Sequence, residues 1–265
     1  MQAQKNMIDS IVSYLQSLPT EISSLVALVT CLSVMLLMLR CFGALGLIVY
    51  SVMAIVASNI QVMKVVTYHF IPDPVAYGTI TFATTFVAND ILAEYYDRSI
   101  AFKNVLLGFA SMLLMAIFMT TTLGINPTLP NDPLYVDVAQ NHNHMLALFS
   151  PTAALFLASA TAYLVSEFLD VWVFTFLKAL THQHFTWLRS SLSTIFATMI
   201  DNSIFNVLAF IVLASAPLPW PVVWHSYIIG TLVMRILLAV LCSPCVGWAK
   251  YFLPPSRTES YNAKS

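Results

Sequence analysis

The sequence predicts an all-α polytopic membrane protein, a helical bundle with about seven transmembrane spans. Of its 265 residues, 59% are hydrophobic and only 9% are charged, and the mean hydropathy is +0.81. Runs of about 20 apolar residues, the length that crosses a hydrocarbon core of about 30 Å, recur between short polar or proline-containing breaks. This composition excludes a large soluble domain.

The apolar runs divide the chain into spans and flanking segments. The expected spans are 22–39, 43–63, 77–96, 104–124, 152–176, 192–214 and 224–246. We therefore expect three regions: an amino-terminal interfacial segment at 1–21, a transmembrane domain at 22–250 and a cytoplasmic tail at 251–265.

Two segments outside the spans have features of interfacial helices. Ile8, Ile11, Val12 and Leu15 fall on one helical face, which is typical of a helix lying at a membrane surface, and Pro19 should end it. The longest polar connection is 125–150, and its later part is a second candidate for an interfacial segment.

The placement of basic residues predicts the orientation, because positive charge in short loops stays on the cytoplasmic side. If the amino terminus is outside, the outer segments contain only Lys5 and Lys64. The inner loops and tail then contain Arg40, Arg98, Lys103, Lys178, Arg189, Lys250, Arg257 and Lys264. We therefore expect an odd number of spans and a cytoplasmic carboxyl terminus.

Acidic residues within the predicted spans indicate a polar interior. Asp90 and Glu94 lie four residues apart on one face of the third span. The fifth span carries a stripe of Ser159, Tyr163, Ser166 and Asp170 beside Glu167, the sixth carries Asp201, and the last carries Arg235. A charge within the hydrocarbon costs about 2.5–3.5 kcal/mol. We therefore expect a polar cavity between helices.

Other interpretations remain open at this stage. Asp90 and Glu94 can also lie at the cytoplasmic headgroup boundary, and small polar residues such as Ser159 can serve only to let helices approach closely. Asn59 and Gln61, near the outer end of the second span, are either hydrogen-bonding partners for a ligand or ordinary interfacial residues.

Several sequence blocks resemble one known family. The blocks are Asn59 to Lys64, Tyr77 to Tyr96, Ala158 to Phe174, Trp187 to Thr194 and Ile200 to Phe205. In order and spacing they are similar to the queuosine precursor transporters, also called the vitamin uptake transporter family. The resemblance covers about residues 40 to 250, nearly the whole transmembrane body.

The resemblance implies a function and a fold. It implies import of a 7-deazaguanine base, or a related queuosine precursor, across the bacterial inner membrane. It also implies a fold similar to the substrate-binding components of energy-coupling-factor transporters. Three positions depart from the family pattern: Asn89 stands where Thr is common, Asp97 where Gly is frequent, and Glu167 where Gln is usual.

The chemistry of the buried polar residues suits a purine-like ligand. One carboxylate accepts the two adjacent N–H groups of a guanine edge in parallel, a neighbouring donor binds the base oxygen, and aromatic rings stack on the base. The candidate substrate-binding residues are Asn59, Gln61, Asn89, Asp90, Glu94, Ser166, Glu167, Asp170, Arg189, Asp201 and Arg235. We expect no catalytic residue, no metal ligand and no cofactor.

Rival functions remain to be distinguished. An intramembrane hydrolase would use paired carboxylates such as Asp170 and Asp201, and a structural membrane subunit would leave its buried acids without a purpose.

The chain lacks a phosphate-binding Gly-rich loop. An external ATPase partner stays open, although transport without one is favoured. The expected contacts are a small-molecule substrate and membrane lipid, with no nucleic acid.

Overall fold

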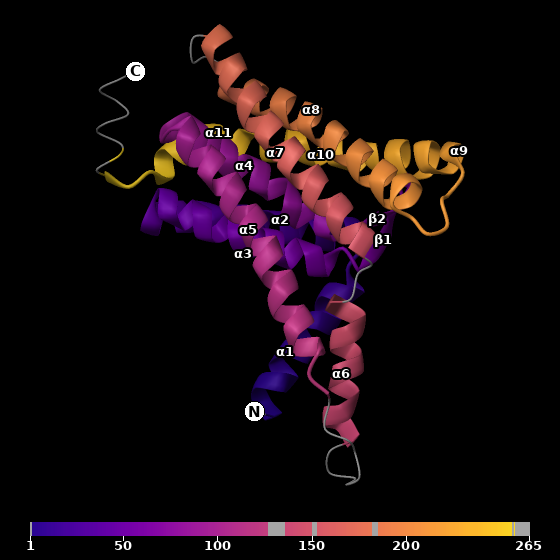
Figure 1. The fold of residues 1–265 in the computed structure, drawn as a ribbon. Helices are drawn as coiled ribbons and strands as arrows, with labels where there is room; N and C mark the ends of the chain where they lie inside the picture. Colours follow the sequence, from indigo (N-terminus) through magenta and orange to yellow (C-terminus); the bar gives the residue numbers. More distant parts are fainter. Residues whose placement is uncertain (1, 127–135, 150–152, 182–184, 256, 258–265) are drawn as a thin grey trace.

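The computed structural model is a bundle of long α-helices with a small hairpin at one end (Figure 1). It describes residues 2–126, 136–149, 153–181, 185–255 and 257. The helices are α1 (Gln2–Ser17), α2 (Thr20–Phe42), α3 (Ala44–Gln61), α4 (Gly78–Tyr95), α5 (Arg98–Leu123), α6 (Val136–Phe149), α7 (Ala153–Leu180), α8 (Thr186–Val207), α9 (Trp220–Val222), α10 (Gly230–Cys242) and α11 (Pro244–Trp248). The strands are β1 (Val65–Tyr68) and β2 (Ile71–Ala76).

Six helical segments in the described part of the chain are long and apolar enough to cross a membrane. They are Thr20–Phe42, Ala44–Gln61, Arg98–Leu123, Leu155–Leu180, Thr186–Val212 and Trp220–Phe252. The last two include π-helical stretches at Leu208–Val212 and Val223–Ile229. The prediction of an all-α polytopic bundle is confirmed, and each of the six segments overlaps an expected span.

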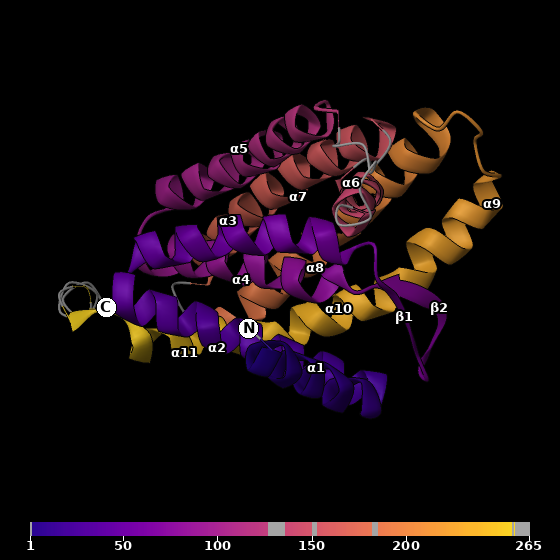
Figure 2. The same cartoon turned by 90° about the horizontal axis from the view of Figure 1, so that it is seen from below.

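The remaining expected span, 77–96, is helix α4, which is not among these six segments. All but two of its 18 residues are buried, and it packs against α2, α3, α5, α7, α8, α10 and α11. Seen from below, α3, α4, α5 and α7 run side by side (Figure 2). Neighbouring helices thus supply partners for Asn89, Asp90 and Glu94 of α4 in place of water. Seven membrane crossings remain a prediction.

An antiparallel hairpin that the sequence analysis does not predict joins α3 to α4. Strands β1 and β2 pair Val65 with Ala76 and Val66 with Val75. Two contacts hold the hairpin to the start of α2: the Tyr68 hydroxyl lies 2.9 Å from that of Ser24, and His69 contacts Glu21 at 2.8 Å. The hairpin also packs on α10.

The amino-terminal segment and the later part of 125–150 are helical, as α1 and α6. Both project from the same side of the bundle (Figure 1). Ile8 and Ile11 on α1 are about half exposed, each at 53%. Their placement at a membrane surface remains a prediction, and residues 127–135 of the polar connection lie outside the described part of the chain.

Cationic side chains close one end of α4. Lys178 donates to the carbonyl of Glu94 at 2.8 Å, and Arg257 donates to the carbonyls of Tyr95 and Tyr96, each at 2.9 Å. Cations at a helix carboxyl terminus satisfy its unpaired carbonyls and interact favourably with the helix dipole. Lys178 and Arg257, two of the basic residues assigned to the inner side, therefore lie together at this end of the bundle.

The position of Arg189 corrects one expectation. The sequence analysis placed it in an inner loop before a span beginning at residue 192, but α8 already begins at Thr186. Arg189 is only 1% exposed. Its guanidinium is buried because it forms an ion pair with Glu94 on α4, at 2.7 Å.

Gly78 provides a test of how closely α3 and α4 approach. A Cβ at this position would lie 2.4 Å from the carbonyl oxygen of Ser58 and 3.0 Å from the nitrogen of Val62, both backbone atoms. Gly78→Ala should therefore force the helices apart and destabilise the protein by about 1–3 kcal/mol, measured by thermal unfolding in detergent. Gly247→Ala is the matched control, because a Cβ there meets nothing within 4 Å. Equal stability of the two variants would contradict the packing.

Candidate functional site

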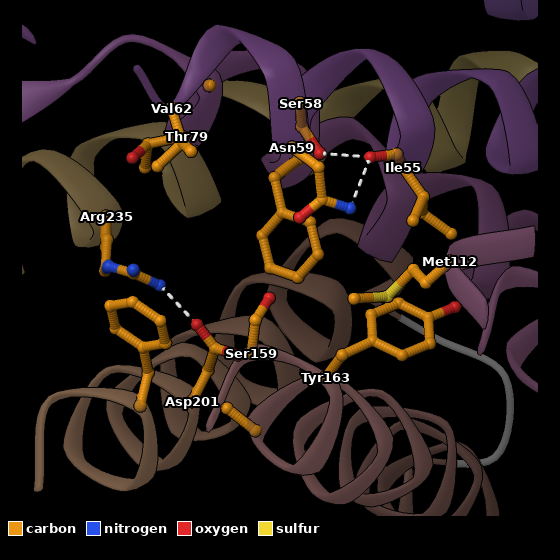
Figure 3. A pocket seen from close by; sticks show the side chains of 14 residues that line it. Ile55, Ser58, Asn59, Val62, Thr79, Met112, Ser159, Tyr163, Asp201 and Arg235 are labelled. Atoms are coloured by element: carbon orange, nitrogen blue, oxygen red, sulfur yellow. Dashed lines mark hydrogen bonds and ion pairs between the residues drawn. The ribbon is translucent and has the colours of Figure 1, made fainter. Parts of the chain in front are cut away.

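A cavity of about 100 Å³ lies in the bundle interior. Its walls come from α3, α4, α5, α7, α8 and α10. They are formed by Ile55, Ser58, Asn59, Val62, Gly78, Thr79, Phe82, Met112, Ser159, Ala162, Tyr163, Asp201, Phe205 and Arg235. Figure 3 shows Asn59, Asp201 and Arg235 facing one space from three different helices. The expected space between the third, fifth and sixth helical segments is therefore present, because α4, α7 and α8 all line it.

An ion pair is the main polar feature of the cavity wall. Arg235 Nη1 donates to Asp201 Oδ2 at 2.7 Å, and the Ser166 hydroxyl donates to Asp201 Oδ1 at 3.2 Å. The side chains of Arg235 and Asp201 are 14% and 9% exposed. Arg235 Nε is buried and has no hydrogen-bond partner within the described structure. The pair therefore offers a carboxylate and an unused donor side by side.

An amide and aromatic rings complete the cavity wall. Asn59 donates its Nδ2 to the carbonyl of Ile55 at 3.0 Å, and its oxygen points into the cavity (Figure 3). Phe82, Tyr163 and Phe205 supply aromatic surface. The Tyr163 hydroxyl donates to the carbonyl of Val105 at 3.2 Å, which fixes the ring. The site thus combines few polar groups with flat apolar walls, as small-molecule sites commonly do.

The other candidate residues from the sequence lie outside the cavity wall. Gln61 accepts a hydrogen bond from Thr81 at 2.7 Å, and Ser166 acts only through Asp201. Of the five acids expected to share a polar space, only Asp201 lines it. Asn89, Asp90, Glu94, Glu167, Asp170 and Arg189 are buried among packed helices.

Glu94 belongs to an ion-pair cluster at the end of α4. Its Oε2 lies 2.7 Å from Arg189 Nη2 and 3.2 Å from Lys178 Nζ. Two cations therefore surround one carboxylate that is only 1% exposed. This arrangement joins α4, α7 and α8, and the depth of Glu94 relative to the headgroups remains a prediction.

Glu167 is held between α4 and α7 by two hydrogen bonds. Thr85 Oγ1 donates to its Oε1 at 2.6 Å, and Asn89 Nδ2 donates to its Oε2 at 2.5 Å. Asn89 in turn accepts from Asn104 at 2.7 Å. Asn89 and Glu167 are two of the three departures from the family pattern, and they contact each other.

Several residues that line the cavity are not among the candidates predicted from the sequence. Phe82, Phe205 and Met112 are ordinary apolar residues in an apolar sequence, so no local signal distinguishes them. Ser159 and Tyr163 do carry a signal, because they share a stripe with Ser166 and Asp170. That stripe correctly indicates which face of α7 points inward.

Comparison with known proteins identifies the family. Residues 76–249 match the model of a family described as "Putative vitamin uptake transporter", which covers more than half of the chain. This chain belongs to the vitamin uptake transporter family. It is a membrane transporter, and the resemblance found in the sequence is confirmed.

The transporter is also similar to a curated protein of Bacillus subtilis (strain 168) named "Probable queuosine precursor transporter". The two are 29% identical over 228 residues, which are 86% of the transporter and 93% of the relative. No solved structure matches the transporter significantly. The expected likeness to energy-coupling-factor components therefore remains a prediction.

Substitutions at Glu167 test whether this residue fixes the helices. Glu167→Ala should remove the partner of the buried Asn89 amide and cost about 1–3 kcal/mol. Glu167→Gln should leave the free energy of unfolding nearly unchanged, because the oxygen of the new glutamine can accept from Asn89. The glutamine amide can donate to the Thr85 hydroxyl, which in turn donates to the carbonyl of Phe82 at 2.7 Å. Thermal unfolding in detergent measures both, and an equal loss in the two variants would show that hydrogen bonding at this position is unimportant.

Proposed function

We propose that the transporter imports a queuosine precursor of the 7-deazaguanine type across the bacterial inner membrane. We further propose that the base binds in the cavity between Asp201, Arg235 and Asn59. Membership of the family, the name of the Bacillus subtilis relative and the polar pattern of the cavity support this proposal. The observation that carries it is the unused donor of Arg235 beside the Asp201 carboxylate.

The hydrogen-bonding pattern of the cavity suits a guanine edge. Such an edge presents one carbonyl oxygen next to N–H donors. Arg235 Nε supplies a donor for the oxygen, and Asp201 accepts from the N–H groups, because an ionised carboxylate has about four acceptor sites. An unmatched buried donor costs about 1–3 kcal/mol, so a ligand that satisfies Arg235 gains this amount.

The size of the cavity suits a ligand only after a conformational change. A dry cavity of about 150 Å³ holds benzene, so about 100 Å³ is too small for a two-ring base. The base therefore enters when the surrounding helices move. Such movement is expected of a transporter that exposes a central site alternately to the two sides of the membrane.

The same proposal sets the orientation of the bundle. We place α4 as a seventh, fully enclosed membrane crossing, with the amino terminus outside and the carboxyl terminus cytoplasmic. The gathering of Arg40, Lys178 and Arg257 near one end supports this direction. Transport requires no covalent chemistry, and we propose that it proceeds without an external ATPase.

The alternative of an aspartyl-type hydrolase has less support from the geometry. It would require Asp170 and Asp201 to act on one site. Asp201 instead pairs with Arg235 and Ser166, whereas Asp170 accepts from Thr194 at 3.3 Å. Accumulation of unaltered base inside liposomes supports a transporter, and conversion of the base would support an enzyme.

Complementation tests the proposed substrate. The protein is expressed in a bacterium that cannot make queuosine, and each precursor base is supplied separately in the medium. We expect queuosine in transfer RNA with at least one precursor. If no precursor restores the modification although the protein is present in the membrane, the proposed substrate is wrong.

Substitutions of the ion pair test the proposed binding site. Asp201→Asn should weaken binding of labelled 7-deazaguanine to the purified protein by about 10- to 100-fold, because hydrogen bonds to a charged group are worth about 1.5–3 kcal/mol. Arg235→Lys keeps the ion pair but loses the guanidinium donors, so it should also weaken binding. Thermal unfolding confirms that each variant is folded. Unchanged affinity in both folded variants would exclude this site.

Filling the cavity tests its location without changing a charge. Ser159→Leu should occupy part of the space and lower uptake of the base by at least about tenfold, the equivalent of 1.4 kcal/mol. Thr161→Leu is the matched control, because Thr161 lies two residues away on an exposed face of α7. Equal uptake by the two variants would place the substrate elsewhere.

A further inference from the structure

Three carboxyl groups in the bundle interior have no cationic partner. Asp90, Glu167 and Asp170 are each 0% exposed, yet they take part in none of the ion pairs found among the described residues. Glu94 and Asp201, in contrast, each contact an arginine. A carboxylate charge in the membrane interior costs about 2.5–3.5 kcal/mol. These three groups therefore need another means of neutralisation.

Hydrogen bonding separates Glu167 from the other two. Both of its oxygens accept hydrogen bonds. Asp90 uses only Oδ2, to which Ser190 donates at 2.5 Å, and Asp170 uses only Oδ1, to which Thr194 donates at 3.3 Å. Asp90 Oδ1 and Asp170 Oδ2 are buried without a hydrogen-bond partner in the described structure. Each aspartate thus has an oxygen that can hold a proton without breaking an existing contact.

The two aspartates face the same stretch of α8. Their partners, Ser190 and Thr194, lie four residues apart, which is about one helical turn. A serine or threonine hydroxyl both donates and accepts. It can therefore donate to a charged carboxylate or turn and accept from a protonated one, so the site accommodates both states.

This stretch of α8 and residues of the ligand cavity border one further small space. A second cavity, of about 10 Å³, is lined by Thr194, Thr198, Phe82 and Arg235, among others. It shares Phe82 and Arg235 with the main cavity. This volume is close to the smallest that holds one water molecule. A water molecule there would lie beside Arg235 of the ligand cavity and beside Thr194, whose hydroxyl donates to Asp170.

We propose that Asp90 and Asp170 form a proton-binding site that couples import of the base to the proton gradient. This inference rests on the proposed function and adds its energy source. A proton enters from the outer side through the ligand cavity, binds to a carboxylate oxygen and leaves as H⁺ on the cytoplasmic side. Binding removes the buried charge, so α4, α7 and α8 can change their packing at a lower cost.

Other charged groups surround the two aspartates. Glu94 lies on the same helix as Asp90, Glu167 and Lys178 lie on α7, Arg189 and Asp201 lie on α8, and Arg235 lies on α10. Arg189 and Lys178 are already paired with Glu94, and Arg235 is paired with Asp201. These three cations are therefore paired with other carboxylates. Asp90 and Asp170 have no cationic partner among the described residues, so a proton can neutralise them.

Liposomes containing the purified transporter test this coupling. Two quantities are measured with labelled 7-deazaguanine: exchange across the membrane without any gradient, and accumulation driven by an imposed pH gradient, acidic outside. We expect wild type to show both. We expect Asp170→Asn and Asp90→Asn to keep exchange, which shows that they fold and bind the base, but to lose at least about nine-tenths of the pH-driven accumulation.

Glu167→Gln is the matched control, because Glu167 is equally buried but has both oxygens hydrogen-bonded, and it should keep pH-driven accumulation. The inference is overturned if wild type exchanges the base but does not respond to the pH gradient. It is also overturned if a sodium gradient drives accumulation instead, or if both asparagine variants remain coupled. Absence of exchange in wild type would instead contradict the proposed function.

Discussion

The structure depends on one constraint: a polar helix in a bilayer must satisfy its polar groups within the protein. Helix α4 carries Asn89, Asp90 and Glu94, and a central position enclosed by seven other helices gives each of these side chains a partner, although Asp90 Oδ1 has none in the described structure. Its neighbours supply Arg189, Ser190 and Glu167 as partners. The arrangement of the surrounding helices follows from the need to cover this helix.

The buried polar residues fall into groups that differ in how completely their polar atoms are paired within the protein. Glu94 pairs with two cations, Glu167 accepts hydrogen bonds at both oxygens, and both residues hold helices together. Asp201 and Arg235 form a pair that borders a cavity and retains an unused donor. Residues of the first kind stabilise the bundle, whereas those of the second kind are available to a ligand. Burial alone therefore does not identify a binding residue, but incomplete hydrogen bonding beside a cavity does.

Much of the fold follows from the sequence, because a bilayer requires apolar runs of a defined length. The expected spans and α1 are helical. The hairpin at 65–76 was not predicted, since its prolines and short strands give no clear alternating pattern. The acids were recognised as an inward-facing set, but their partners were not. Ser190 and Arg189 reach Asp90 and Glu94 across about 100 residues of sequence, and only tertiary packing determines such contacts.

The central claim is that the ligand lies in the cavity bordered by the Asp201–Arg235 ion pair, separate from the acids of α4. The most direct measurement is an experimental structure of the purified transporter with 7-deazaguanine bound. The account predicts density for the base against Phe82 and Tyr163, with its oxygen near the Arg235 guanidinium and its N–H groups near Asp201. Density for the base beside Asp90 and Asp170, with the Asp201–Arg235 cavity empty, would contradict the account.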